Sequence, residues 1–338
     1  MTAWRITLLP QVGLLIDGDA EPAGALVKAV ERLGCEANAI AELAALQPDD
    51  PVKTIAIQCQ RVRVPPVNPE EEGATCLFFH DGVRVSLSAD RRMVFVYDGQ
   101  VRVDLTVDGG PVVCSFTAGW QANVAFVRTS VPVLLCLLLW LHGYYYIHGA
   151  LLSLPDMGTV LLLGESGAGK STTLLAMLQH GARWFTDDMA FVGPDGTNGS
   201  GLYGLPRDFH LTETTLTAFP HVQPLVLNEP RFRQKASVRV SASLPATQRE
   251  ASLPVTLVLL EPRGTSFSAQ PLDQSDVFLV LLRASAWGAV PGMPLTTEHH
   301  AALQHLTCRA RGFRVSLQEN SVGDVTELLR LLSLMPMA

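Results

Sequence analysis

The feature that most constrains the fold of this chain is a glycine-rich loop placed between an apolar strand and a helix. The loop runs from Gly164 to Ser171 with the sequence GESGAGKS, after the apolar run 160–163 and before the helical pattern 172–179. In such a loop, glycines let successive backbone N–H groups turn inward around a phosphate, at the positive end of the following helix. The order strand, loop, helix therefore predicts an α/β domain that binds a nucleotide.

The loop's side chains predict how the nucleotide is held. Lys170 is expected to reach the β- and γ-phosphates, and the hydroxyl of Ser171 is expected to ligate magnesium. We therefore predict that the loop binds a nucleoside triphosphate together with Mg²⁺, with ATP and GTP both open on these residues alone. The expected nucleotide-binding residues are Gly164, Glu165, Ser166, Gly167, Ala168, Gly169, Lys170, Ser171 and Thr172.

Two adjacent carboxylates, Asp187 and Asp188, follow the short apolar segment 183–186. A carboxylate at a strand end beside a phosphate loop can hold magnesium, and a second one can accept the proton of an attacking hydroxyl. An Asp-Asp pair is also typical of a solvated turn. Its spacing from the loop favours the catalytic interpretation.

The first half of the chain is predicted to be β-rich. A helical pattern covers 24–46 and a loop covers 65–73. Short alternating runs then follow, separated by Asp-Gly pairs that favour tight hairpins. The expected strands of this antiparallel meander lie at 76–80, 83–89, 93–99, 101–110 and 112–119, with Asp-Gly turns at 81–82, 98–99 and 108–109.

A change to leucine-rich sequence near residue 125 predicts two domains, a β-rich 1–125 and a catalytic 126–338. The second is expected to open with an apolar helix over 126–145 and to be α/β, with a glycine-rich loop up to Gly204. The tyrosines at 144–146 are expected to lie in a core or a subunit interface. Further expected elements are strands at 189–192, 254–260 and 277–282 and an amphipathic helix at 325–334.

Composition excludes several partner classes. The net charge is −7 and the basic residues are scattered, so nucleic acid is not an expected partner. The longest apolar run, 131–141, is shorter than the roughly 20 residues that span a bilayer, so no membrane is expected. The N-terminus lacks a secretion signal and the six cysteines lack zinc-ligand spacing, so we expect free thiols and a cytoplasmic location.

The region 147–192 resembles the catalytic domain of HPr kinase/phosphorylase, and more closely the broad group of HPr-kinase-related proteins. The resemblance combines His148-Gly149, a strand pair, the glycine loop, a helix ending at His180-Gly181, and Asp187-Asp188. It implies the P-loop fold that this family shares with phosphoenolpyruvate carboxykinase, with a mixed sheet. It also implies ATP-dependent phosphorylation of a serine hydroxyl.

The resemblance also implies roles for individual residues by matching position. Lys170 would contact phosphates, Ser171 and Asp188 would hold magnesium, and Asp187 would be the general base. His148 would line the site near the γ-phosphate.

Two departures from the family pattern are visible. Thr172 stands where these kinases usually have Glu, and their Arg-Gly-Leu-Gly signature is absent, with 204–207 (Gly-Leu-Pro-Arg) as the nearest counterpart. This argues against HPr itself as substrate and against the reverse reaction. Arg207 is the first candidate to stabilise the transferring phosphoryl group, and the further candidates are Arg231, Arg233 and Lys235.

The predicted function is an ATP-dependent kinase that acts on a serine of a peptide or protein. Related kinases act on natural-product precursors such as lasso peptides, and the β-rich domain would then recognise the acceptor. Two alternatives stay open: a kinase for serine or another small hydroxyl metabolite, and a nucleotide-binding switch or ATPase without an acceptor. Homo-oligomerisation is also left open.

Overall fold

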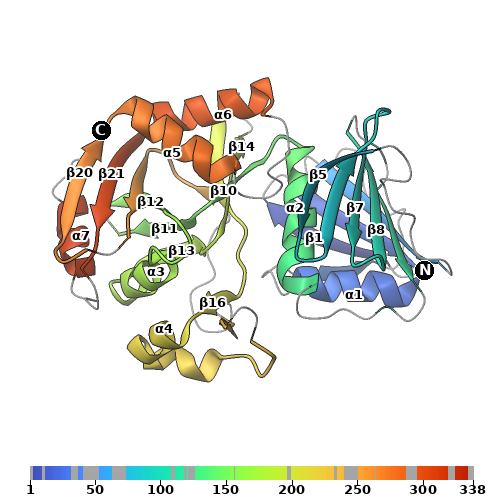
Figure 1. Cartoon of the computed structure of the whole chain (residues 1–338), viewed down its shortest axis with the longest axis horizontal. Coiled ribbons are helices and arrows are strands. Elements are labelled where there is room, and N and C mark those ends of the chain that lie inside the picture. The colour runs from blue at the N-terminus through green and yellow to red at the C-terminus, as the bar shows by residue number, and fades with distance from the viewer. Residues whose placement is uncertain are drawn as a thin grey trace. The chain divides into compact units, whose positions relative to one another are not determined.

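The computed structural model of the chain divides into two compact units, the first ending at His142 and the second beginning at Gly143 (Figure 1). The predicted boundary after residue 125 precedes this division. The residues that the structure describes are 3–9, 12–31, 37–40, 53–62, 74–107, 110, 112–117, 120, 126–155, 157–195, 199–231, 234–239, 250–262, 264–286, 295–318 and 324–333.

The described part of the first unit is built on a nine-stranded sheet in the order β3-β1-β2-β4-β9-β8-β7-β6-β5. Its centre is parallel, because β2 pairs with β4 and β4 with β9 in the same direction. The elements are β1 (Ala3–Leu9), β2 (Val12–Gly18), α1 (Ala20–Glu31), β3 (Ala37–Ile40), β4 (Lys53–Val62), β5 (Thr75–His80), β6 (Val83–Leu87), β7 (Arg92–Tyr97), β8 (Val101–Thr106), β9 (Val112–Thr117), the π-helical turn η3 (Phe126–Ser130) and α2 (Val131–Trp140).

The predicted meander is confirmed in strands β5 to β9, which pair antiparallel with their neighbours. Its turns use the expected residues: φ is 50° at Asp81, 76° at Gly82, 48° at Asp98 and 63° at Gly99. Two positive φ angles in a row match the twist of a two-residue hairpin. The predicted loop at 65–73 and the turn at 108–109 lie outside the described residues.

The predicted helix over 24–46 is only partly correct. Helix α1 ends at Glu31, and residues 37–40 form strand β3, paired antiparallel with β1. Alanine-rich sequence is a weak helix signal, and pairing with an existing sheet edge overrides it here. Residues 41–46 lie outside the described part.

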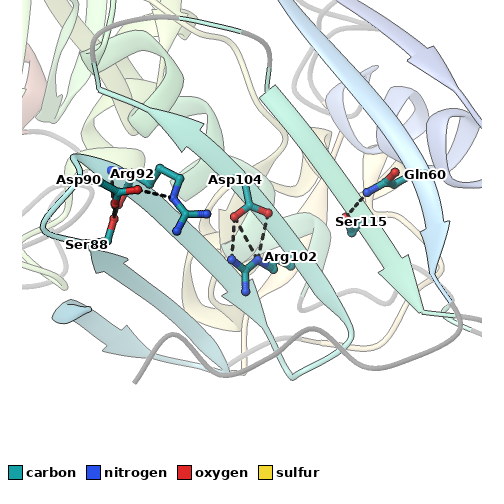
Figure 2. Close-up of polar contacts among 7 residues, drawn as sticks. All are labelled: Gln60, Ser88, Asp90, Arg92, Arg102, Asp104 and Ser115. Atoms are coloured by element: carbon teal, nitrogen blue, oxygen red, sulfur yellow. Dashed lines mark hydrogen bonds and ion pairs between the residues drawn. The ribbon is translucent and has the colours of Figure 1, made fainter. Parts of the chain in front are cut away.

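Polar contacts run along one side of the first unit's sheet (Figure 2). Arg102 and Asp104 stand two residues apart on β8, so they share a face and form an ion pair of 2.8 Å. Gln60 of β4 donates to Ser115 of β9 at 2.9 Å. Arg92 binds Asp90 at the turn before β7. The Gln60–Ser115 contact ties neighbouring strands and the two ion pairs are local, and together they form no cluster that suggests chemistry.

The predicted helix over 126–145 is divided between the two units. Helix α2 ends at Trp140 and belongs to the first unit, where Phe126 of the preceding turn contacts Tyr97 and Trp120 edge-on or tilted. The chain then enters strand β10 (Tyr145–His148) of the second unit. The predicted single helix therefore ends within the first unit, and its last residues belong to the second.

The second unit contains three sheets in its described part, in the orders β13-β11-β12-β19-β21-β20, β10-β14-β15-β18 and β16-β17. The strands are β11 (Ala150–Leu154), β12 (Gly158–Leu163), β13 (Arg183–Thr186), β14 (Met189–Pro194), β15 (Ser200–Gly204), β16 (Phe209–Leu211), β17 (Ala236–Val238), β18 (Glu250–Ala251), β19 (Val255–Leu260), β20 (Ser268–Leu272) and β21 (Ala310–Ser316). The helices are α3 (Lys170–Gln179), α4 (Glu213–Ala218), the 3₁₀ helix η4 (Pro220–Leu225), α5 (Gln274–Ala286), α6 (Thr297–Cys308) and α7 (Asp324–Ser333).

The six-stranded sheet of the second unit is mixed, as predicted. Strands β12, β19 and β21 are parallel, whereas β11, β13 and β20 pair antiparallel. Helices α3 and α7 share a hydrophobic core with this sheet, including Leu174, Met177 and Leu328, while α5 and α6 pack together and contact β10, β14 and β21 (Figure 1). The mixed α/β class of the chain is thereby confirmed.

Other expectations for the second unit have mixed outcomes. The strand at 254–260 and the helix at 325–334 are confirmed, and Gly181 ends α3 with φ of 85°. The predicted strand at 277–282 is wrong, because these residues form the middle of helix α5. A short apolar run cannot by itself distinguish the two states. The predicted glycine-rich loop up to Gly204 is strand β15, paired with β14.

Within the described residues, no helix is long and apolar enough to cross a membrane. The cysteines in this part of the chain, Cys59, Cys76, Cys114, Cys136 and Cys308, are free thiols.

Candidate active site

The glycine loop connects β12 directly to α3, and its backbone requires glycine. Gly164, Gly167 and Gly169 have φ of 144°, 91° and 98°, in the region that side-chain-bearing residues rarely adopt. A Cβ atom on Gly164 would lie 2.5 Å from the carbonyl oxygen of Leu260 on the neighbouring β19. The loop can therefore turn tightly against the sheet before the helix begins.

Lys170 is the first residue of α3, and its ammonium folds back over the loop. It donates hydrogen bonds to the carbonyl oxygens of Gly164 at 2.7 Å and Glu165 at 3.2 Å. Burial lowers the pKa of Lys170, and the charges of Asp188 and Asp187 oppose this shift. The lysine is thus buried against the loop, within electrostatic reach of both carboxylates.

The two residues after Lys170 lie in the first turn of α3. Ser171 is half-buried. The hydroxyl of Thr172 lies 3.2 Å from that of Thr215 in α4, whose N-terminus is capped by Thr212. The residue that departs from the family pattern therefore ties α3 to a neighbouring helix.

The turn between β13 and β14 carries Asp187 and Asp188 and is fixed by its own hydrogen bonds. The hydroxyl of Thr186 accepts from the backbone N–H of Met189 at 2.9 Å, and the carbonyl of Asp188 accepts from Gly149 at 3.3 Å. A Cβ atom on Gly149 would lie 2.9 Å from the carbonyl oxygen of Leu162. Glycine beside His148 therefore allows β10 and β11 to meet the turn closely.

The carboxylate of Asp188 contacts two side chains, those of His148 and Arg207. Its Oδ1 lies 2.6 Å from Nδ1 of His148, and its Oδ2 lies 2.7 Å from Nη1 of Arg207. Burial alone would raise the pKa of Asp188, but the hydrogen bond from His148 and the charge of Arg207 lower it well below the usual range. Asp188 is therefore a carboxylate at any ordinary pH.

Asp187 has the opposite electrostatic environment. Its side chain is buried, and Oδ1 has no hydrogen-bond partner among the described residues. Burial, with the neighbouring Asp188 charge, raises the pKa of Asp187 to about 7. A carboxyl with a pKa near neutrality can accept and return a proton under ordinary conditions.

The structure brings together the predicted residues His148, Lys170, Asp187, Asp188 and Arg207. It keeps Arg231 apart, because this exposed side chain binds Glu213 at 2.6 Å. Arg233 lies outside the described residues. The charge of Lys235, in contrast, acts on both Lys170 and Asp187.

One residue of the site was missed from the sequence. Tyr146 was expected only in a core or interface, but its hydroxyl lies 3.0 Å from Nδ1 of His148. Both side chains stand on β10 two residues apart, which places them on one face of the strand. The available signal was this two-residue spacing, and the expectation that the tyrosines lie in a core or an interface concealed it.

The donors proposed for magnesium are chemically suited to it. Ser171 and Asp188 offer only oxygen, which Mg²⁺ prefers, and each Asp188 oxygen has a second lone pair beyond its bond to His148 or Arg207. Within the described residues, no group of three or more His, Cys, Asp and Glu side chains could hold a metal ion. A magnesium ion held by one carboxylate together with substrate phosphates needs no such group.

Comparison with known proteins gives a short match to part of the chain. No protein-family model matches the chain. A stretch of 46 residues is 57% identical to HPr kinase/phosphorylase from Lactobacillus delbrueckii subsp. bulgaricus. The match spans 14% of this chain and 14% of the relative, so it relates part of the chain to a kinase without extending to either whole protein.

Proposed function

We propose that this chain is an ATP-dependent kinase that transfers the γ-phosphoryl group to a serine hydroxyl of a peptide or protein. The observation that carries this proposal is the contrast between Asp187 and Asp188. One is buried, without a partner on Oδ1 and with a pKa of about 7, and the other is held as a carboxylate. This pair offers a base and a fixed negative charge beside the lysine of a glycine loop.

The chemistry follows from these roles. Asp187 takes the proton of the acceptor hydroxyl as its oxygen attacks the γ-phosphorus, the bond between that phosphorus and the β–γ bridging oxygen breaks, and ADP leaves. Lys170 is positioned to exchange its bonds to loop carbonyls for bonds to phosphate oxygens. Magnesium held by Ser171 and Asp188 would neutralise phosphate charge. His148 and Arg207 keep Asp188 oriented.

The relative supports the reaction class and leaves the acceptor open. Its name describes a kinase and phosphorylase for HPr, but this chain has Gly204-Leu205-Pro206-Arg207 in place of the family's second signature. We therefore propose a different peptide or protein acceptor, for example a natural-product precursor, in a cytoplasmic setting.

The first unit is proposed to recognise this acceptor. Its described residues contain none of the site residues, and Phe79 on the edge strand β5 is 66% exposed beside Arg84. A Phe79→Ser variant of the full chain should raise the KM for the acceptor peptide and leave ATP affinity unchanged. Equal KM values for the variant and the wild type would contradict this role.

The test of the kinase proposal is label transfer from γ-labelled ATP with Mg²⁺ to serine-containing peptides and to fractionated lysate. Wild type should produce labelled phosphoserine, and Asp187→Asn should lose at least about a hundredfold in rate, the usual contribution of a general base. Glu213→Gln removes a carboxylate from an exposed ion pair of the same unit and serves as the control.

Each other outcome selects a different function. Equal transfer by wild type and Asp187→Asn would overturn the general-base assignment. Label recovered only in small molecules would favour a metabolite kinase. ATP hydrolysis without transfer to any fraction would favour a switch or ATPase.

A further inference from the structure

Lys235 stands on a rigid part of the second unit, immediately before strand β17. Strand β17 pairs with β16 through Leu211 and Ala236, and the backbone N–H of Leu227 donates to its other side at the carbonyl of Ser237. The preceding residue, Gln234, has φ of 64°, a left-handed conformation that is costly for a residue with a side chain. The chain therefore bends sharply before Lys235 and then runs into a strand that is held on both sides.

The ammonium of Lys235 is close to the site but binds none of its residues. The side chain is half-buried, while Gln234 beside it is exposed. In the part of the chain that the structure describes, Lys235 makes no hydrogen bond or ion pair. A half-buried cation without a partner is unusual, because burial removes water that would otherwise solvate it.

Strand pairing and hydroxyl contacts locate Lys235 near the first turn of α3. The next residue, Ala236, pairs with Leu211, and Leu211 is followed by Thr212, whose hydroxyl lies 3.1 Å from that of Thr215. The hydroxyl of Thr215 lies 3.2 Å from that of Thr172, two residues after Lys170. In line with this position, the charge of Lys235 adds to burial in lowering the pKa of Lys170 and opposes the rise in the pKa of Asp187 that burial causes.

Three other cations of the second unit have partners that account for them. Arg207 binds Asp188, Arg231 binds Glu213, and Lys170 donates to two loop carbonyls. Lys235 alone, among these four, has no protein partner within the described residues. A second ammonium beside the phosphate-loop lysine raises the local positive potential, which favours a multiply charged anion.

We propose that Lys235 contacts the terminal phosphate of the bound nucleotide and so makes the site selective for a triphosphate over a diphosphate. This inference rests on the proposed function, because it assumes that the glycine loop binds the nucleotide. The loop N–H groups and Lys170 would contact the β-phosphate of ATP and of ADP equally. Lys235 would contact only the γ-phosphate, which ADP lacks.

The experiment is equilibrium binding of ATP and of ADP, each with Mg²⁺, to the full chain. Lys235→Met keeps the apolar stem and removes the charge. It should weaken ATP binding about tenfold and ADP binding by less than about twofold, since one charge-assisted hydrogen bond is lost. Lys235→Arg should recover most of the ATP affinity.

Arg231→Met is the matched control, because it removes one positive charge from the same segment at an exposed ion pair. It should leave both affinities unchanged, and thermal unfolding should verify that all three variants are folded. Equal losses for ATP and ADP in Lys235→Met, or no loss for either, would overturn the inference.

Failure of this inference is distinguishable from failure of the proposed function. Binding needs no acceptor, so a chain that transfers no phosphate can still show triphosphate selectivity through Lys235. Wild type that binds neither nucleotide would overturn both proposals. Wild type that binds ATP, with unchanged selectivity in Lys235→Met, would overturn only the role of Lys235.

Discussion

Nη1 of Arg207 lies 2.7 Å from Oδ2 of Asp188, and the Arg207 side chain is only 9% exposed. This ion pair joins the segment after β15 to the turn between β13 and β14. Because the pair is largely buried, each charge depends on the other to offset its lost hydration.

Replacing Arg207 by Met should therefore destabilise the fold. The variant leaves Asp188 with His148 as its remaining side-chain partner, and we expect the free energy of unfolding to fall by about 1–3 kcal/mol in urea titrations. Arg231→Met removes an arginine whose pair with Glu213 is exposed, and this control should change stability by less than about 1 kcal/mol. Equal losses of stability in the two variants would contradict a larger contribution from the buried Arg207–Asp188 pair.

Asp187→Asn should be more stable than the wild type at alkaline pH although it transfers no phosphate. The folded pKa of Asp187 is raised to about 7, above its unfolded value of about 3.8, so its ionisation disfavours the folded state as pH rises between these values. Asparagine does not ionise. We expect the variant to gain about 1–3 kcal/mol at pH 8.

The pH dependence distinguishes this effect from a general improvement in packing. At pH 4 the wild-type carboxyl is protonated in the folded state, so most of the gain should disappear there. Thermal unfolding of both proteins from pH 4 to pH 8 provides the measurement. A gain that is constant over this range would contradict the raised pKa.

The glycine loop and its flanking elements could be predicted because their determinants are local. Three glycines with positive φ, an apolar strand before them and a helix after them all lie in one continuous segment. The meander is predictable for the same reason, since the Asp-Gly turns at 81–82 and 98–99 set the pairing of the strands on either side. The family resemblance placed His148 and Asp188 in the site, but nothing in the sequence indicated their contact with each other.

Features that depend on distant packing could not be predicted. The run 277–282 is helical in α5, which packs on α6 and β10, and nothing within the run distinguishes a strand from a helix. Helix α2 belongs to the first unit, and the turn that precedes it contacts Tyr97 through Phe126, a contact that the sequence pattern does not reveal. Lys235 was one of several scattered cations in the sequence, and only the β16–β17 pairing places it near Lys170.

Gly204 is predicted to be intolerant of a methyl group. A Cβ atom there would lie 2.5 Å from Cβ and 2.8 Å from the carbonyl carbon of Phe185 on β13, so Gly204→Ala should destabilise the fold by about 1–3 kcal/mol. Gly24 is the matched control: it lies inside α1, and a methyl group there would meet no atom within 4 Å, so Gly24→Ala should stabilise by about 0.5–1 kcal/mol. Urea titrations of both variants should give opposite signs, and a loss in both would contradict the close approach at Phe185.

His299 is predicted to make stability fall in mild acid. Its Nε2 lies 2.6 Å from the hydroxyl of Ser285, and its ring stacks on Tyr145 with centroids 4.3 Å apart. Burial, with a smaller effect from the charge of His300, lowers its pKa from 6.5 to about 4. Between pH 6.5 and about 4, the imidazole is protonated in the unfolded chain but stays neutral in the folded chain. This contribution to stability is therefore complete above pH 6.5 and is lost as pH falls to about 4.

His299→Gln keeps a hydrogen-bonding side chain that does not titrate, and it isolates this effect. Between pH 7 and pH 4 the free energy of unfolding of the wild type should fall by about 2 kcal/mol more than that of the variant. This figure follows from the lowered pKa of His299, reduced because the imidazole is only partly shielded from water. His300→Gln is the control, since this neighbour packs edge-on against Phe278 and should leave the wild-type pH dependence largely in place. Parallel stability curves for wild type and His299→Gln would show that the buried imidazole takes up its proton in the folded state, and that the contact with Ser285 does not depend on a neutral ring.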